Sequence, residues 1–240
     1  MRPVTIGFRA KTARAISVAL APGNSEPAYI ARWEISLCDP AFPPTSQPHH
    51  EVMELPWDDA LSAVRPIEAR IEKVAIKAVA SLVKELRSKD CKVDSVGVVG
   101  SPDRSLERIG NPHIRAHAAE GILFRHCLEV AAAAHDIQWR SFSDRSIDEI
   151  AAAELHRQPQ EIKTVLDAIG RSAGKPWRAD ERAAATAAWL ALRQLFFRRR
   201  PFGVSSRAKR RRPGRQRPAS RIFSFPQNRC RQRTIRDRGF

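Results

Sequence analysis

Short apolar runs near the N-terminus predict β-strands. Val4 to Phe8 and Ala15 to Leu20 are separated by RAKTAR, a pattern typical of a β-hairpin. After the turn PGNSEP, the segment AYIARWEISL offers three candidate core residues, Ile30, Trp33 and Ile35. The chain is therefore predicted to open with three antiparallel strands.

Helical spacing follows in the middle of the chain. Apolar residues recur every three or four positions from Pro66 to Lys89, with charged residues between them. The preceding CDPAFPPTSQPHHEVMELP is rich in Pro, so we expect a surface connection in which His49 and His50 are solvated. The apolar VDSVGVVG, residues 93 to 100, is typical of a strand covered on both faces. The order strand, helix, strand predicts a right-handed parallel crossover.

Helices and strands alternate in the rest of the chain. Asn111 suits the cap of a helix that begins at Pro112 and reaches about Ala134, although Gly121 weakens its middle. A fifth strand is expected from Ile137 to Phe142, followed by helices in SIDEIAAAEL, PQEIKTVLDAIGR and the Ala-rich RADERAAATAAWLALRQLFF. The order predicts an α/β fold in which three antiparallel strands and a parallel βαβ form a mixed five-stranded sheet, with helices on both faces.

The net charge of +16 is concentrated at the C-terminus. Residues 198–240 hold 16 Lys and Arg against one acid, whereas residues 1–197 hold 26 Lys and Arg against 25 acids. We predict a folded domain over residues 1–197 and a disordered Arg/Pro-rich basic tail over 198–240. Such a tail neutralises phosphates non-specifically, but a frame-shifted terminus would show the same change in composition.

The cysteines and the apolar segments indicate in which cellular compartment the protein is expected. Four cysteines lie far apart and form no metal-finger spacing, so reduced, structural thiols are expected at Cys38, Cys91, Cys127 and Cys230. The sequence contains neither a signal-peptide pattern nor an apolar stretch of membrane-spanning length. We expect a cytoplasmic protein with no membrane partner, and the sequence identifies no protein partner.

Two stretches, TIGFRAKTARAISVAL and VLDAIGRSAGKPWRADERAAATAAWLAL, together with the element order, resemble the ribonuclease H-like superfamily and its RuvC-like resolvase branch. The resemblance covers about residues 4–195. It implies a ribonuclease H-like fold, a nucleic-acid partner, and cleavage by two Mg²⁺ or Mn²⁺ ions held by several carboxylates.

The resemblance places metal-binding acids at three positions. The first strand has Arg9 there, and the fourth strand ends in Gly100 and Ser101, with Asp103 two residues further on. Acids remain only at the start of the last helix, where the candidate catalytic residues are Asp180 and Glu181. First-turn acids are also favoured by the helix dipole without any catalytic role.

Arg9 argues against a two-metal site because a guanidinium keeps its charge and repels divalent ions. Three arrangements are open. Arg9 pairs with Asp180 or Glu181, binds a phosphate, or points outward into solvent.

A second group of candidates begins the helix after the fourth strand. HIRAHAAE places His113, His117 and Glu120 on one helix side as candidate metal ligands, with Asp103 as a further one. The alternative is a polar, partly exposed helix start, because Ile114 stands where the zinc motif on a helix has Glu.

The same helix start also suits an anion. Free N–H groups attract phosphate, and the candidate anion-binding residues there are Ser101, Asn111, His113 and Arg115. Ligands of open α/β sheets bind beyond the carboxyl ends of strands. We therefore expect one centre at which the following side chains converge: Ser101, Asp103, His113, Arg115, His117 and Asp180.

Two functions follow. The leading hypothesis is a RuvC-like protein with a degenerate two-metal site that binds nucleic acid or nucleotide without hydrolysis. The alternative is a divergent metal-dependent nuclease or phosphoesterase that uses acidic and His residues near the last helix, with Mg²⁺ or Mn²⁺ as cofactor. A kinase-like function ranks last, because the first hairpin has no glycine-rich phosphate loop.

Overall fold

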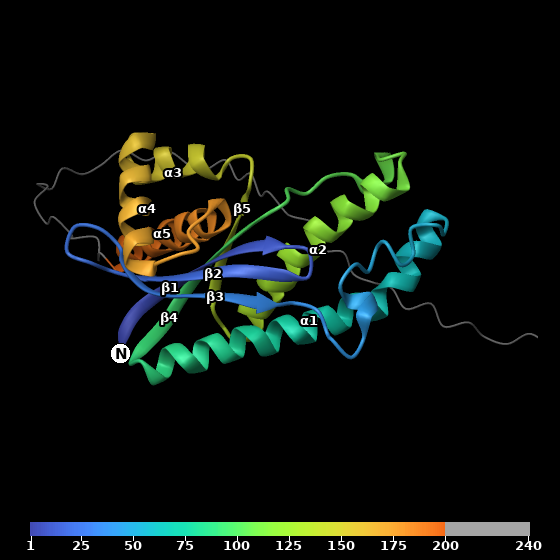
Figure 1. Ribbon diagram of the computed structural model, residues 1–240, viewed down its shortest axis with the longest axis horizontal. Coiled ribbons are helices and arrows are strands. Elements are labelled where there is room, and N and C mark those ends of the chain that lie inside the picture. Colours follow the sequence, from blue (N-terminus) through green and yellow to red (C-terminus); the bar gives the residue numbers. More distant parts are fainter. Residues whose placement is uncertain (200–240) are drawn as a thin grey trace, which may run out of the picture. The chain divides into compact units, whose positions relative to one another are not determined.

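The computed structural model describes residues 1–199 and contains one sheet with the strand order β3-β2-β1-β4-β5 (Figure 1). The strands are β1 (Arg2–Lys11), β2 (Arg14–Ala21), β3 (Ala28–Ser36), β4 (Cys91–Gly100) and β5 (Gln138–Ser143). β2 pairs antiparallel with β1 and β3, whereas β4 pairs in parallel with β1 and β5. The mixed five-stranded sheet predicted from the sequence is confirmed.

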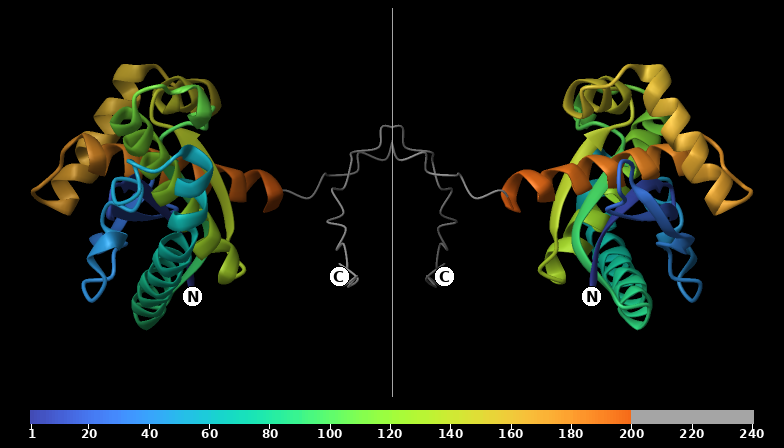
Figure 2. Two further views of the ribbon diagram at one scale, coloured as in Figure 1. Left: turned by 90° about the vertical axis from the view of Figure 1, so that its right-hand side faces the viewer. Right: turned by 90° about the vertical axis from the view of Figure 1, so that its left-hand side faces the viewer.

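Helices cover both faces of the sheet (Figures 1 and 2). One face packs against α1 (Trp57–Ser88) and α2 (Pro112–Ala134). The other packs against α3 (Ile147–Leu155), α4 (Pro159–Ala173) and α5 (Ala179–Arg199). Two short 3₁₀ helices, η1 (Pro43–Thr45) and η2 (Leu106–Arg108), lie in the connections.

The alternation of side chains along β1 determines which residues face each layer. Val4, Ile6 and Phe8 are fully buried in the core formed with α1 and α2. Thr5 and Gly7 point to the opposite side, where the Thr5 hydroxyl donates to the Ala188 carbonyl of α5 at 2.8 Å. Successive side chains of a strand alternate between faces, so Arg9 also lies on the α5 side.

Small residues let α5 lie directly on the sheet. A Cβ atom at Gly7 would lie 1.8 Å from the Ala184 carbonyl oxygen, and one at Gly97 of β4 would lie 2.4 Å from that of Ala187. Both distances are shorter than van der Waals contact, so these positions accept only glycine in the present packing. The small side chains of the Ala-rich α5 allow this close approach, which fixes the start of α5 over β1.

The predicted start of the first helix, at Pro66, is wrong. The helix begins at Trp57 and carries Pro66 inside it. An interior proline removes one backbone hydrogen bond. Here the additional turns bury Ala60 and Val64 in a small apolar cluster with Val52, and Trp57 packs against this cluster. Tertiary packing therefore outweighs the local preference of proline.

The described cysteines are free thiols, as expected. Burial raises the pKa of Cys127 to about 12, which keeps this thiol protonated and unreactive. Cys230 lies outside the described residues, as does the predicted tail beyond Arg199. Over residues 1–199, none of the helices combines the length and hydropathy that crossing a membrane requires.

Candidate functional site

The carboxyl ends of the parallel strands β1, β4 and β5 meet at one edge of the sheet, beside the start of α5. A cleft of about 570 Å³ opens there. Its lining comes from β1, β4, α3, α4, α5 and the segments before α3 and α5, and includes Arg9, Asp144, Asp148, Lys163, Trp177, Arg178, Asp180 and Arg182. Open α/β sheets generally bind ligands at such an edge.

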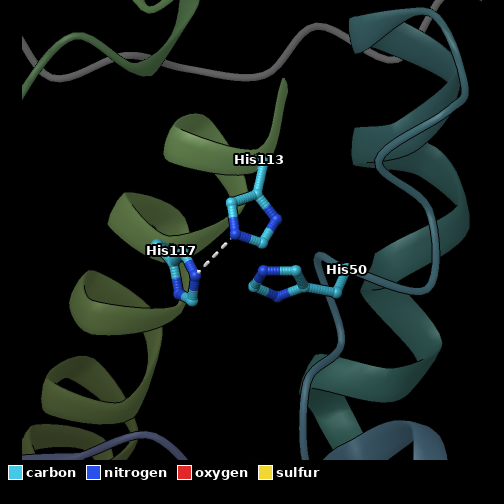
Figure 3. A group of neighbouring side chains, drawn as sticks. All are labelled: His50, His113 and His117. Atoms are coloured by element: carbon cyan, nitrogen blue, oxygen red, sulfur yellow. Dashed lines mark hydrogen bonds between the residues drawn. The ribbon is translucent and has the colours of Figure 1, made fainter. Parts of the chain in front are cut away.

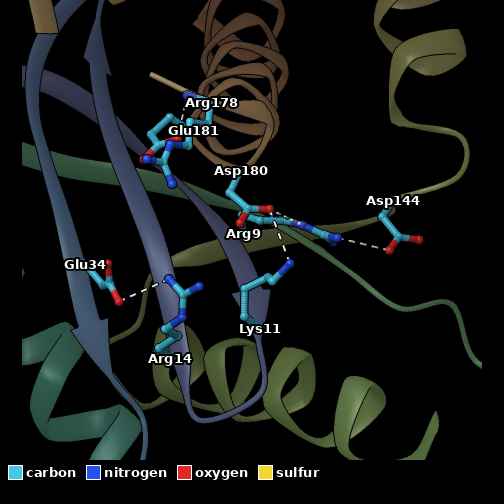
Figure 4. A network of polar contacts seen from close by, with 8 residues as sticks. All are labelled: Arg9, Lys11, Arg14, Glu34, Asp144, Arg178, Asp180 and Glu181. Atoms are coloured by element: carbon cyan, nitrogen blue, oxygen red, sulfur yellow. Dashed lines mark hydrogen bonds and ion pairs between the residues drawn. The ribbon is translucent and has the colours of Figure 1, made fainter. Parts of the chain in front are cut away.

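Arg9 lies between two carboxylates from different elements (Figure 4). Its Nε atom is 3.5 Å from Oδ1 of Asp180 in α5, and its terminal nitrogen is 3.2 Å from Oδ2 of Asp144, which follows β5. The Nζ atom of Lys11 is also 3.5 Å from Oδ1 of Asp180. Of the three arrangements open from the sequence, the structure has the ion pair with Asp180, and the Arg9 side chain is only 16% exposed.

Glu181 does not take part in this arrangement. Its carboxylate accepts a hydrogen bond of 2.8 Å from the backbone N–H of Arg178, and the residue is buried. Figure 4 shows the two neighbouring acids pointing in different directions, Asp180 toward Arg9 and Glu181 toward Arg178. This contact satisfies a free N–H at the start of α5, which is the usual structural use of an acid at the third helical position.

Asp144 is a site residue that the sequence reasoning missed. The family resemblance implies acids at three positions, and none of these lies after the fifth strand. A general signal was available, because Asp144 directly follows a parallel strand whose carboxyl end meets that of β4. The backbone N–H of Asp144 donates to the Gly100 carbonyl at 3.0 Å, which fixes the residue at this edge.

Other residues that line the cleft combine cations, Lys163, Arg178 and Arg182, with the aromatic side chain of Trp177. The carboxylate of Asp167 pairs with Lys163 at 2.7 Å and with Arg182 at 2.9 Å. The hydrogen bond from Lys163 lowers the pKa of Asp167. The ring of Trp177 packs against Gly170 of α4, and its buried Nε1 atom has no hydrogen-bond partner among the described residues.

The residues predicted to bind an anion at the start of α2 have other partners. The Asn111 side chain caps the helix by accepting from the Ile114 N–H at 3.0 Å. The Arg115 guanidinium lies over the Trp57 ring, 4.8 Å from its centroid. Ser101 packs at Gly121, where a Cβ atom would lie 2.4 Å from its hydroxyl oxygen.

Asp103 is a mostly exposed acid that pairs with Arg125 of α2. Together with Ser101, His113, Arg115 and His117, it is absent from the residues that line the Asp180 cleft within the described chain. The expected convergence of all these side chains on one centre is therefore wrong. The connection after β4 directs them toward α2, whereas Asp180 lies on the α5 side of the sheet.

His113 and His117 of α2 form a separate cluster with His50 (Figure 3). The Nε2 atoms of His113 and His117 are 3.1 Å apart, and the His50 ring lies beside both. Glu120 does not face His113 but is fully buried, with its Oε1 atom 2.7 Å from Nδ1 of His50.

The expectation that His49 and His50 are solvated is wrong. His49 is 5% exposed, and its Nε2 atom lies 3.3 Å from Glu68 of α1. The connection before α1 packs against the helices, so both imidazoles find carboxylate partners far away in sequence. The composition of a Pro-rich segment does not indicate such long-range partners.

Comparisons with known proteins give structural similarity without sequence similarity. No protein-family model matches the chain, and no curated protein matches it. A Thermus thermophilus RuvC structure is similar with a TM-score of 0.42 and 12% identity, covering 78% of this chain and 92% of that one. T. thermophilus RuvC in complex with a Holliday junction substrate gives a TM-score of 0.46 at 12% identity, covering 82% of this chain and 94% of that one.

The yeast mitochondrial Holliday junction resolvase Ydc2 gives a TM-score of 0.42 at 11% identity, covering 81% of this chain and 82% of that one. Because these identities and TM-scores are low, the site residues of this chain are assigned from its own geometry and not from these structures. The strand order, the parallel and antiparallel pairing and the placement of the helices agree with the fold predicted from the sequence. The chain has an α/β fold with a mixed five-stranded sheet and helices on both faces, which is the arrangement that the resemblance to the ribonuclease H-like superfamily implied.

Proposed function

We propose that the protein binds a phosphate-bearing ligand, nucleic acid or nucleotide, in the Arg9 cleft and does not hydrolyse it by a two-metal mechanism. The observation that carries the proposal is the Arg9 guanidinium, which lies between the carboxylates of Asp144 and Asp180. A fixed positive charge thus holds the position that a divalent ion would need.

The residues of the cleft do not fit a pair of Mg²⁺ or Mn²⁺ ions. Two such ions need several carboxylates whose oxygens are free to coordinate them. Asp180 is engaged by both Arg9 and Lys11, and Asp144 by Arg9, so that among the described residues Asp148 is the one lining carboxylate without an ion pair. An ion between these carboxylates would displace the ion pairs and lie beside a guanidinium that cannot lose its charge.

The rest of the cleft supports a phosphate-bearing ligand. The basic side chains that line it, Arg9, Lys163, Arg178 and Arg182, outnumber the acids Asp144, Asp148 and Asp180 by one, and a volume of about 570 Å³ lies within the usual range for small-molecule sites. Arginine is suited to phosphate because its planar donors match two phosphate oxygens at once. Trp177 adds an aromatic side chain of the kind on which a nucleobase stacks.

A binding assay on the full chain tests this proposal. We would measure the affinity for a fluorescent mononucleotide and for a short single-stranded oligonucleotide, each in the presence of EDTA. We expect measurable binding without metal, and a loss of about tenfold or more in Arg9→Ala, because charge-assisted hydrogen bonds to phosphate contribute about 1.5–3 kcal/mol each.

The matched control is Arg14→Ala. Arg14 begins the next strand of the same hairpin, pairs with Glu34 at 3.1 Å and does not line the cleft, so its substitution removes the same charge elsewhere (Figure 4). Equal losses in the two variants would mean that binding depends on overall charge, and the proposal would be abandoned. Binding that requires Mg²⁺ or Mn²⁺ would equally contradict it.

A further inference from the structure

We propose that His50, His113 and His117 bind one divalent transition-metal ion of the zinc class, and that Glu120 positions His50 for this purpose. The cluster lies between α2 and the connection that precedes α1 (Figure 3). None of its members lines the Arg9 cleft in the described part of the chain, so the proposal is independent of the proposed function.

The spacing of the ring nitrogens suits a shared ion. One nitrogen from each of the three histidines lies within 4.8 Å of the other two. The Nε2 atoms of His113 and His117, one helical turn apart, are already separated by 3.1 Å. Two imidazole nitrogens on a tetrahedral zinc ion, each about 2.0–2.1 Å from the metal, lie about 3.3 Å apart.

The orientation of the rings supports the same conclusion. Ring centroids are 4.5 to 5.0 Å apart, and the planes meet at 70° to 84°. Figure 3 shows the three rings converging on one point from two separate segments. Stacked imidazoles would turn their faces to each other, whereas rings that share a metal must direct their nitrogen edges to one centre.

Glu120 fixes the tautomer that a metal ligand requires. Its Oε1 atom lies 2.7 Å from Nδ1 of His50, so the Nδ1–H of the neutral ring donates to the carboxylate. This leaves the lone pair of Nε2 free, and the buried Nε2 atom has no hydrogen-bond partner among the described residues. A carboxylate bound to the second nitrogen of a metal-binding histidine is a recurrent arrangement in zinc sites.

The burial of Glu120 also favours a nearby cation. This carboxylate is fully buried, and its Oε2 atom has no hydrogen-bond partner among the described residues. A buried negative charge is costly unless a positive charge or hydrogen bonds compensate it. Asp103 does not contribute, because it pairs with Arg125. A metal ion held by His50 would place the missing positive charge close to Glu120.

Three histidines leave a fourth tetrahedral position open. His113 and His117 are exposed, so this position would face solvent and accept water. Zinc sites with three protein ligands and an open position are generally of the catalytic kind, whereas purely structural sites have four. The ion would also fasten the connection before α1 to α2.

The test is the metal content and zinc affinity of the full chain without a polyhistidine tag. The protein would be loaded with Zn²⁺, gel-filtered and analysed by elemental mass spectrometry, and a chromophoric chelator would report the affinity. We expect about one zinc per chain, loss of this zinc in His50→Ala and in His117→Ala, and an affinity about 10- to 100-fold lower in Glu120→Gln.

Two variants serve as matched controls. His126→Ala removes another histidine of α2, whose side chain is 57% exposed and pairs with Glu129, and it should retain the zinc. Asp180→Asn should also retain it, which separates this site from the Arg9 cleft. Cobalt substitution adds a spectroscopic readout, because tetrahedral Co²⁺ absorbs visible light strongly, and this absorption should vanish in His117→Ala.

Thermal unfolding distinguishes variants that have lost zinc binding from variants that do not fold. Zinc should raise the melting temperature of the wild type and of His126→Ala, because a ligand that binds only the folded state stabilises it. Zinc should leave the melting temperature of His117→Ala unchanged. This variant should still fold, because His117 is exposed and its side chain is not needed for packing. Absence of zinc from the wild type, or zinc retained by the double variant His50→Ala and His117→Ala, would overturn the proposal.

Discussion

Arg9 is the residue on which the account of the cleft depends. It joins the end of β1 to Asp144 after β5 and to Asp180 at the start of α5, within hydrogen-bond or ion-pair distance of both. Its side chain is 16% exposed, so water screens these interactions less than on an open surface. The residue thus combines two roles, holding three elements together and presenting positive charge to the cleft.

A double-mutant cycle measures the first role. Arg9→Ala, Asp144→Ala and the double variant should give a coupling energy of about 1 kcal/mol, at the upper end for partly exposed ion pairs. Denaturant unfolding provides the free energies. If the two single substitutions are additive within about 0.3 kcal/mol, Arg9 and Asp144 do not interact in solution.

At the scale of elements, α5 depends on its direct contact with β1. A methyl group at Gly7 would collide with the Ala184 backbone, which is held inside a helix and cannot yield as a side chain would. We expect Gly7→Ala to lower the free energy of unfolding by about 1–3 kcal/mol or more, the usual cost of overpacking a core. Gly110→Ala is the control, because nothing lies within 4 Å of a Cβ atom there. Similar small effects in both variants would contradict the observed packing.

A second contact between elements makes stability depend on pH. Arg140 of β5 binds both carboxylate oxygens of Glu154 in α3, and these hydrogen bonds lower the pKa of Glu154. A carboxylate with a lowered folded-state pKa stabilises the protein above its unfolded pKa of about 4.3. This contribution disappears as the pH falls through the lower folded-state pKa.

Glu154→Gln should therefore lose less stability than the wild type between about pH 6 and pH 3. The difference should be about 0.5–1 kcal/mol, because the pair is about one-third exposed and solvent screens it. Chemical unfolding at several pH values measures it. Glu149→Gln, an exposed acid on the same helix, should retain the wild-type pH profile. Parallel profiles for all three proteins would contradict this role of the pair.

At the scale of the whole chain, the net positive charge is concentrated in the C-terminal residues. Residues 198–240 carry 16 of the 42 Lys and Arg residues, whereas acids nearly balance bases in the rest. Truncation after residue 199 should reduce nucleic-acid affinity at low salt and flatten its dependence on salt, because fewer counterions are released. Fluorescence anisotropy over a series of salt concentrations tests this. An unchanged slope would mean that the C-terminal arginines do not contact phosphates.

The strands β1, β2 and β4 could be predicted from the sequence because they are buried on both faces and therefore appear as short, local apolar runs. The position of Arg9 followed from the family resemblance, whereas its ion pair with Asp180 was one of three arrangements that the sequence left open. His50 could not be predicted, because its partner Glu120 lies 70 positions away and the contact depends on how a Pro-rich connection folds back. The helix start at Trp57 was missed for a related reason, since packing there overcomes the unfavourable Pro66.

The most direct test of the account is a cleavage assay with branched and single-stranded DNA in the presence of Mg²⁺ or Mn²⁺. The account predicts that the full chain binds these substrates and leaves them intact, because Arg9 pairs with the carboxylates of Asp144 and Asp180. Metal-dependent cleavage by the wild type that is lost in Asp180→Asn would contradict it.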